Sequence, residues 1–186
     1  MSTAQPDRAS RGARAKTNTL RAGDERAPCC VTAGSRCGTR FDALRAWTCK
    51  HTGKGVRIVN ETRGKAPCYA QPVGYDGRSF WVARDHGCDT EKLLHEVCHF
   101  VVAPKTRRNR ENYGLGPGVI AVTPVESDNE EVTVMLLEAL LAPTFGLDLR
   151  KIARPDYNTH DRRNVDWSAC ELRASELLAQ MQPTLP

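Results

Sequence analysis

The hydrophobic pattern is most regular between residues 88 and 104, "CDTEKLLHEVCHFVVAP", where apolar residues recur at the spacing of a helix turn. This spacing gathers them on one face and therefore predicts an α-helix. Asp89 or Thr90 can cap its N-terminus, and Pro104 ends it because proline cannot continue a helix. Titratable side chains interrupt the apolar run, so this helix is the first candidate for chemistry.

Two further helices are predicted after a loop rich in Arg, Asn, Gly and Pro at residues 104–124. The segment "SDNEEVTVMLLEALLAP", residues 127–143, starts with possible caps at Ser127 or Asp128, continues with acidic residues and ends near a proline. A last amphipathic helix is expected over residues 165–181, beyond a loop that contains "RPDYNTHDRR". Helices therefore dominate the second half of the chain.

The first half predicts strands after one short helix. The helix is expected at residues 39–50, "TRFDALRAWTCK", and strands at 55–62, "GVRIVNET", and 68–73, "CYAQPV". The strongest local signal is "VGYDGRSFWVAR", in which Asp76 and Gly77 form a turn dipeptide before an aromatic and β-branched run, as in a hairpin. Because strands and helices are segregated along the chain, an α+β fold is predicted rather than alternating βαβ units.

Length and composition bound the organisation of the chain. Its 186 residues suit one domain with a hydrophobic core plus tails. Residues 1–36 hold few large apolar side chains and predict a disordered basic tail, so a single metal-binding domain is expected at 37–186. No apolar run approaches the roughly 20 residues that a membrane-spanning helix needs, and the N-terminus lacks the apolar region of a secretory signal. A cytoplasmic location without membrane contact is the resulting expectation.

Charge and cysteine content add expectations about partners and thiols. The net charge is +5, but no basic stripe is interleaved with aromatic residues, so nucleic-acid binding is not expected, although the basic tail leaves it open. Eight cysteines without a secretory signal predict free thiols. Cys29, Cys30, Cys37, Cys49 and His51 lack the paired spacing of a zinc knuckle. The expected partner is a protein or peptide substrate.

The candidate chemistry lies in "HEVCH" at residues 95–99. His95 and His99 are four residues apart, so a helix places both on one face, where they can hold a single metal ion. Glu96 lies about 100° round the helix axis, from where its carboxylate can reach a water bound to that ion. This is the H-E-x-x-H arrangement, in which zinc lowers the pKa of its water and the glutamate takes the proton. The alternative is a helix whose histidines face solvent or satisfy buried carbonyls.

A catalytic zinc site normally needs a third protein ligand. The next predicted helix supplies two candidates, Glu130 and Glu131 in "SDNEEVTV". Glu130 shares the more apolar face of that helix, whereas both glutamates could instead complement its N-terminus. Asp128 is expected to orient a ligand histidine from behind. Two histidines and one carboxylate also form the ligand set of non-haem iron oxygenases, so Fe²⁺ remains an alternative to Zn²⁺.

Other groups near the motif have candidate roles. Cys98 lies inside the motif but is expected to be a small core residue, and His86 is a reserve ligand. The loop at residues 105–110, "KTRRNR", follows the helix directly and can rim the site and bind an acidic substrate, or it can simply be solvated. Tyr113 is a candidate catalytic residue that donates to an oxyanion, and its alternative is to pack and anchor the loop.

Residues 95–118, "HEVCHFVVAPKTRRNRENYGLGPG", resemble two families. The H-E-x-x-H helix with a later glutamate helix resembles the gluzincin plan of small zinc metallopeptidases. The longer string is similar to the elongation factor P hydroxylase family, in which the motif continues with an aromatic residue, an aliphatic–Ala pair, an Arg pair and an aromatic–Gly run. The matching positions here are Phe100, Val102, Ala103, Arg107, Arg108, Asn112, Tyr113 and Gly114.

These resemblances imply different reactions on one scaffold. The first implies a small zincin-like domain with zinc and a glutamate ligand in the "EExA" register, which favours Glu131. The second implies a metal-dependent hydroxylase. Glu96 favours hydrolysis, because a hydrolase needs a base beside the metal-bound water and an oxygenase does not obviously need one. The sequence thus predicts a zinc-dependent, peptidase-like hydrolase, with a hydroxylase and a non-catalytic, metal-stabilised interaction module as alternatives.

Overall fold

The computed structural model describes residues 38–60, 71–84, 87–115, 122–148 and 164–182. These residues form four α-helices, two short 3-10 helices and a three-stranded sheet, which confirms the α+β prediction. The helices, in chain order, are α1 (Thr39–Thr52), α2 (Thr90–Val102), η3 (Asn112–Gly114), α3 (Pro124–Leu141), η4 (Ala142–Phe145) and α5 (Trp167–Met181). The predicted tail at residues 1–36 lies outside the described part of the chain.

The sheet is small and mixed. Its strands are β1 (Val56–Val59), β2 (Val73–Tyr75) and β3 (Phe80–Ala83), in the spatial order β1–β3–β2. β1 runs parallel to β3, and β2 pairs with β3 in the antiparallel hairpin that the sequence predicted. The carboxylate of Asp76 accepts the main-chain N–H groups of the two residues that follow Gly77, so the predicted turn dipeptide does close the hairpin.

Gly77 brings the hairpin against the loop that follows α2. Its φ of 85° lies in the left-handed region, and a Cβ there would come within 2.7 Å of the Asn109 main-chain oxygen. The Tyr75 hydroxyl lies 2.9 Å from the main-chain oxygen of Gly77 and 2.7 Å from that of Arg108. The hairpin therefore fixes the course of this loop. Of the strand predicted at residues 68–73, only the end falls within the described residues.

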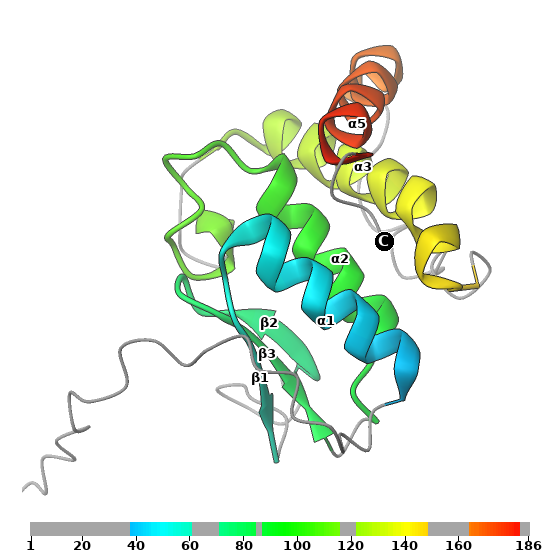
Figure 1. Ribbon diagram of the computed structural model, residues 1–186. Coiled ribbons are helices and arrows are strands. Elements are labelled where there is room, and N and C mark those ends of the chain that lie inside the picture. The colour runs from blue at the N-terminus through cyan, green and yellow to red at the C-terminus, as the bar shows by residue number, and fades with distance from the viewer. Residues whose placement is uncertain (1–37, 61–70, 85–86, 116–121, 149–163, 183–186) are drawn as a thin grey trace, which may run out of the picture.

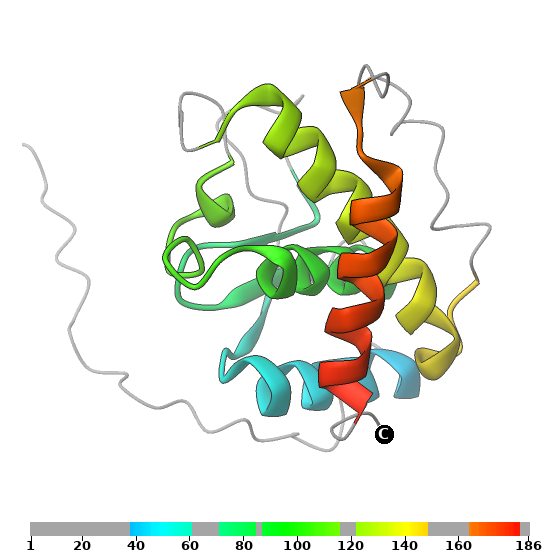
Figure 2. The same cartoon turned by 90° about the horizontal axis from the view of Figure 1, so that it is seen from above.

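Helix α2 is the centre of the fold. It packs against α1, both strands of the hairpin, α3 and α5 (Figures 1 and 2). As predicted, Asp89 caps its N-terminus, because its side chain accepts the Lys92 main-chain N–H. The core-facing side chains of this helix are Leu93, Leu94, Val97, Cys98 and Val101. The two histidines of the motif therefore sit on a helix that its neighbours hold on several sides.

Helix α3 begins earlier than the sequence suggested. Thr123 caps it through reciprocal hydrogen bonds with Glu126, and Pro124 occupies its first position, where no main-chain N–H is needed. The predicted caps at Ser127 or Asp128 are therefore wrong, because both residues lie inside the helix. The two candidate glutamate ligands consequently lie in the second turn, beyond the free N–H groups that an N-terminal carboxylate would complement.

Helix α5 packs along α3 (Figure 1). Asp166 caps it by accepting the Ala169 main-chain N–H, so the helix starts at Trp167, close to the predicted start, and it ends at Met181 as predicted. Among the described residues, no helix combines the length and apolar character needed to span a bilayer.

The cysteines differ in part from the prediction of free thiols. Cys49, Cys98 and Cys170 are buried thiols outside any disulfide. Cys88, directly before the cap of α2, is disulfide-bonded, which corrects that prediction at this position. Cysteines 29, 30, 37 and 68 lie outside the described residues.

Candidate metal centre

Three of the predicted ligands converge between α2 and α3. The Nε2 atoms of His95 and His99 lie 3.1 Å apart. The Glu131 carboxylate faces both rings, with Oε1 3.7 Å from His95 Nε2 and Oε2 3.3 Å from His99 Nε2. The ligand atoms of His95, His99 and Glu131 all lie within 4.8 Å of one another, close enough to share an ion. Among the described residues, no other group of three His, Cys, Asp or Glu side chains meets this condition.

The spacing of these donor atoms fits a small divalent cation. Zinc bonds of about 2.0–2.1 Å to nitrogen and oxygen place neighbouring corners of a tetrahedron about 3.3 Å apart. The His95–His99 separation of 3.1 Å lies near that value, and each ring nitrogen lies 3.3 or 3.7 Å from its nearer Glu131 oxygen. Among the described residues the centre offers two imidazoles and one carboxylate, the number of protein ligands that a catalytic zinc has. The donor set and its spacing therefore fit a divalent metal ion.

Glu138 orients one of the histidines and was missed by the sequence reasoning. Its Oε2 lies 3.0 Å from Nδ1 of His95, and its side chain is 4% exposed. A carboxylate at Nδ1 keeps the proton on that nitrogen and leaves the Nε2 lone pair free toward His99 and Glu131. The orienting carboxylate of His95 is thus Glu138 and not the predicted Asp128. The signal for it was a glutamate inside an apolar run, two turns after Glu131.

His99 is the more deeply buried histidine and lies in a negative environment. Burial alone would lower its pKa, but the hydrogen bond and charge of Glu131, followed by the charges of Glu96 and Glu130, raise the pKa above its ordinary value. Its Nδ1 is buried without a hydrogen-bond partner among the described residues. A carboxylate environment that favours positive charge on this ring also favours a cation bound at its Nε2.

Glu130, the other candidate ligand, points elsewhere. It forms an ion pair with Arg107, and both side chains are about nine-tenths buried. The prediction that Glu130 faces inward is correct, but its partner is the guanidinium and not the histidines. Adjacent residues of a helix point about 100° apart, so Glu131 and Glu130 cannot both face the same histidines. The structure therefore brings Glu131 to the candidate metal centre.

Glu96 lies beside the histidines, with its carboxylate held by Tyr113. The Tyr113 hydroxyl lies 2.7 Å from the main-chain oxygen of Glu96 and 3.1 Å from its Oε2. The Tyr113 ring is buried and stacks between Tyr75 and His99, with centroid distances of 5.0 and 5.5 Å. Burial and then the charge of Glu96 raise the pKa of Tyr113 well above its usual range, so the hydroxyl remains a donor.

The backbone around Tyr113 is held in an unfavourable conformation. Asn112 and Tyr113 have φ values of 45° and 56°, in the region that non-glycine residues rarely adopt. Arg107 donates to the Tyr113 main-chain oxygen at 2.8 Å and so helps to keep the residue there. Residues in such conformations persist where surrounding contacts determine them, and they cluster at functional sites. The contacts support a role for Tyr113 in holding Glu96 in addition to anchoring the loop.

The three arginines of the loop after α2 differ in their partners. Arg107 is buried in its contacts with Glu130 and Tyr113. Arg108 donates to the main-chain oxygens of Val101 and Ala103, at the C-terminal end of α2, and is not available to a ligand in this arrangement. The sequence predicted that this loop rims the site and binds an acidic group. Of its three arginines, only Arg110 has a guanidinium that the other described residues leave available for that role.

The remaining candidate ligands do not join the centre. Burial, followed by the charge of Glu138, raises the pKa of the Cys98 thiol well above its ordinary value, so the sulfur stays protonated in the core. His51 lies on α1, stacked on Trp47. His86 and His160 lie outside the described residues.

We expect Glu138→Gln to weaken zinc binding by about tenfold, the lower end of what the loss of an orienting carboxylate costs. The amide still accepts a hydrogen bond from His95 but no longer offers a charge that increases the basicity of the ring. Competition with a chromophoric chelator measures the affinity. Glu171→Gln, the same change at an exposed position of α5, is the control. Equal affinities of the two variants would show that Glu138 does not support the ligand.

Comparison with known proteins adds no identification: no family model matches the chain, and neither curated proteins nor solved structures give a match. The resemblances to the gluzincin and elongation factor P hydroxylase families therefore remain predictions from a short motif.

Proposed function

We propose that this protein is a metal-dependent hydrolase of the zincin type, with zinc at His95, His99 and Glu131 and a peptide or protein amide as substrate. The observation that supports the proposal most is the placement of a fourth side chain. The charge of Glu96 acts on the ring of His99, and its carboxylate accepts a hydrogen bond from Tyr113, whose ring stacks on that same histidine. A carboxylate beside a metal centre is what general-base hydrolysis requires.

In the proposed hydrolysis, some side chains bind or orient the metal ion and others transfer the proton. A zinc ion at this centre would lower the pKa of a bound water toward about 7 and polarise a substrate carbonyl. Glu96 would accept the proton of that water and return it to the leaving amine. Tyr113 keeps the Glu96 carboxylate from turning away, and Glu138 keeps His95 in the tautomer that offers Nε2. The two positioning contacts, Tyr113 with Glu96 and Glu138 with His95, are present in the structure.

A hydroxylase is the second candidate, because two histidines and one carboxylate are also the iron-binding triad of oxygenases. The donor set of the centre fits either ion. A carboxylate held in place beside the donors supports hydrolysis, since the oxygenase triad does not itself need a base. In the third alternative, a metal-stabilised interaction module, the contact of Glu96 with Tyr113 would have only a structural role.

Metal analysis combined with an activity assay tests the proposal. Protein purified without added metal is expected to contain about one zinc per chain, and the zinc-loaded protein is expected to cleave members of a mixed peptide library. The cleavage products identify the bond by mass spectrometry. Iron as the bound metal, with oxygen-dependent mass gain of 16 Da per added oxygen atom in place of cleavage, would favour the hydroxylase. Metal binding without either reaction would leave the interaction module.

A further inference from the structure

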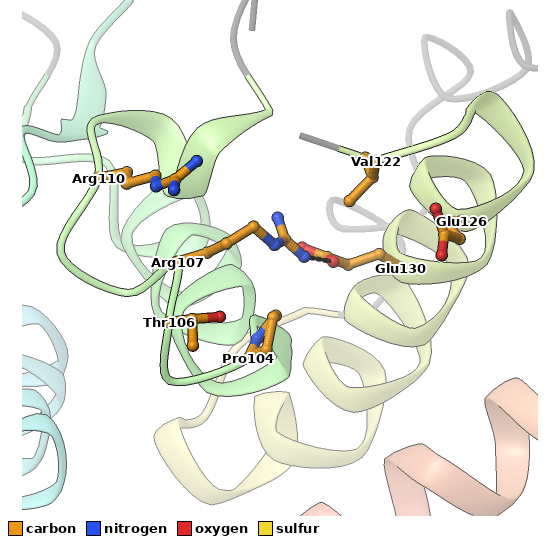
Figure 3. A pocket seen from close by; sticks show the side chains of 7 residues that line it. All are labelled: Pro104, Thr106, Arg107, Arg110, Val122, Glu126 and Glu130. Carbon is orange, nitrogen blue, oxygen red and sulfur yellow. Dashed lines mark hydrogen bonds and ion pairs between the residues drawn. The ribbon is translucent and has the colours of Figure 1, made fainter. Parts of the chain in front are cut away.

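A polar cavity lies beside the candidate metal centre. Its volume is about 480 Å³, and it opens between the loop after α2 and the first two turns of α3 (Figure 3). This volume is in the range of small-molecule and side-chain binding sites. The lining residues are Pro104, Thr106, Arg107, Arg110, Val122, Glu126 and Glu130.

Most of the charge in this cavity is already matched. Arg107 reaches across it to pair with Glu130, as Figure 3 shows, so these two residues form a neutral, buried wall. Glu126 is the capping residue of α3: its Oε2 accepts the main-chain N–H and the hydroxyl of Thr123, and these hydrogen bonds lower the pKa of its carboxyl. Both carboxylates of the cavity therefore already have partners: Glu130 pairs with the Arg107 guanidinium, and Glu126 caps α3.

Arg110 is the exception among the charged lining residues. Within the described part of the chain, its guanidinium makes no hydrogen bond or ion pair, and the residue is exposed. Its side chain extends into the space between the loop and α3 (Figure 3). Its main chain is fixed, because its N–H bonds the Arg107 carbonyl and its own carbonyl accepts the Tyr113 N–H. The fixed backbone keeps the root of this side chain at the cavity, and its planar guanidinium favours a planar anionic partner.

Two residues that line the cavity are direct neighbours of groups at the metal centre. Arg107 lines the cavity and also donates to the carbonyl of Tyr113, the residue whose hydroxyl contacts Glu96. Glu130 lines it and directly precedes Glu131. His95, His99 and Glu131 do not themselves line the cavity, so Arg107 and Glu130 are the residues that connect it with the centre.

From these contacts we propose that the cavity binds a carboxylate of the substrate through Arg110, so that acidic peptides are the substrate class. The carboxylate belongs to an acidic side chain or to the C-terminus of a peptide, since both present the same planar anion. The substrate interpretation rests on the proposed hydrolase function, whereas carboxylate binding itself does not need the metal.

The test is a titration of the full-length, ¹⁵N-labelled protein without added metal, followed by NMR. The probes are the α-amide of N-acetylaspartate, which has a side-chain carboxylate, N-acetylglycine, which has a terminal one, and the α-amide of N-acetylasparagine, which has none. Amide shifts are expected at Thr106, Arg110 and Glu126 with one or both carboxylate probes, and the tighter probe identifies the source of the carboxylate. The asparagine compound is expected not to bind.

Arg110→Gln is expected to weaken carboxylate binding by about tenfold, the effect of losing one charge-assisted hydrogen-bonded pair. Arg78→Gln removes the same charge from the exposed turn of the hairpin and is expected to change nothing. The inference is overturned if the two variants bind alike or if the asparagine compound binds as well as the acidic probes. Because the titration needs neither metal nor turnover, that result would leave the hydrolase proposal untouched, and an absence of zinc binding would overturn that proposal alone.

Discussion

Glu96→Gln is expected to reduce kcat/KM for peptide cleavage by about 10²–10⁴-fold, because the amide cannot accept the proton of the attacking water. Zinc affinity is expected to fall only slightly, since His95, His99 and Glu131 keep their positions and only a nearby charge is lost. The Tyr113 hydroxyl can still donate to the amide oxygen, so the fold is expected to survive the change. Cleavage of the peptide that the parent protein hydrolyses fastest, measured beside a chelator titration, gives both quantities.

The matched control is Glu91→Gln, the same substitution in the first turn of α2. This control is expected to cleave the peptide at nearly the parental rate, apart from a small loss of helix stability. If Glu96→Gln retains parental activity while binding zinc, the glutamate is not the base and the hydrolytic mechanism is wrong. Loss of zinc binding in this variant would instead show that Glu96 is itself a ligand.

Glu131→Gln is expected to weaken zinc binding by more than about 100-fold, because a carboxylate that contacts the ion itself is replaced by a neutral amide. The loss of a residue that only orients a ligand costs less, roughly 10–100-fold. Glu130→Gln, one residue earlier, is expected to weaken zinc binding much less, because only a charge near His99 is lost and no ligand. That substitution should instead lower the free energy of unfolding by about 1.5–3 kcal/mol, because it removes the charge that pairs with the buried Arg107. Chelator competition and urea denaturation separate these effects.

The pair of variants distinguishes the two glutamates that the sequence left open. The reverse pattern, with zinc affinity lost in Glu130→Gln and retained in Glu131→Gln, would mean that the ion recruits the other carboxylate and breaks the Arg107 pair. Equal zinc affinity in both variants would place the metal elsewhere. A stability loss in Glu131→Gln alone would point to a purely structural cluster.

Local physics explains why several elements were predictable. The hairpin follows from Asp76 and Gly77, whose turn geometry depends on a few neighbouring atoms. The start of α2 follows from the side chain of Asp89, which bonds a main-chain N–H three residues away. The pairing of His95 with His99 follows from the helix repeat alone. In each case the interacting groups lie close in sequence.

The errors concern groups whose roles depend on packing or on a longer local pattern. The start of α3 was misplaced because Pro124 was taken as part of the loop, although Thr123 and Glu126 have the spacing of a capping box. Glu138 was missed because its partner, His95, lies 43 residues away on another helix.

The choice between Glu130 and Glu131 could not be made from the sequence for a similar reason. Both glutamates point toward the interior from α3, but in directions about 100° apart. Which one meets the histidines depends on how α2 and α3 cross, and on the presence of Arg107 as a partner for the other. The residues around position 130 determine neither the crossing of the two helices nor the position of Arg107. The pair with Glu130 occupies Arg107, and the main-chain oxygens of α2 occupy Arg108, which leaves Arg110 as the arginine of this loop that a ligand can reach.

X-ray absorption at the zinc edge of the full-length protein, loaded with one equivalent of zinc, tests most directly whether these side chains hold a metal. The predicted spectrum shows nitrogen and oxygen ligands at about 2.0–2.1 Å with the outer-shell pattern of two imidazoles, and no sulfur near 2.3 Å. In the Glu131→Gln variant this spectrum should be lost or changed. A sulfur shell, which would place zinc on the cysteines, or a spectrum without imidazole scattering would contradict a metal centre between α2 and α3.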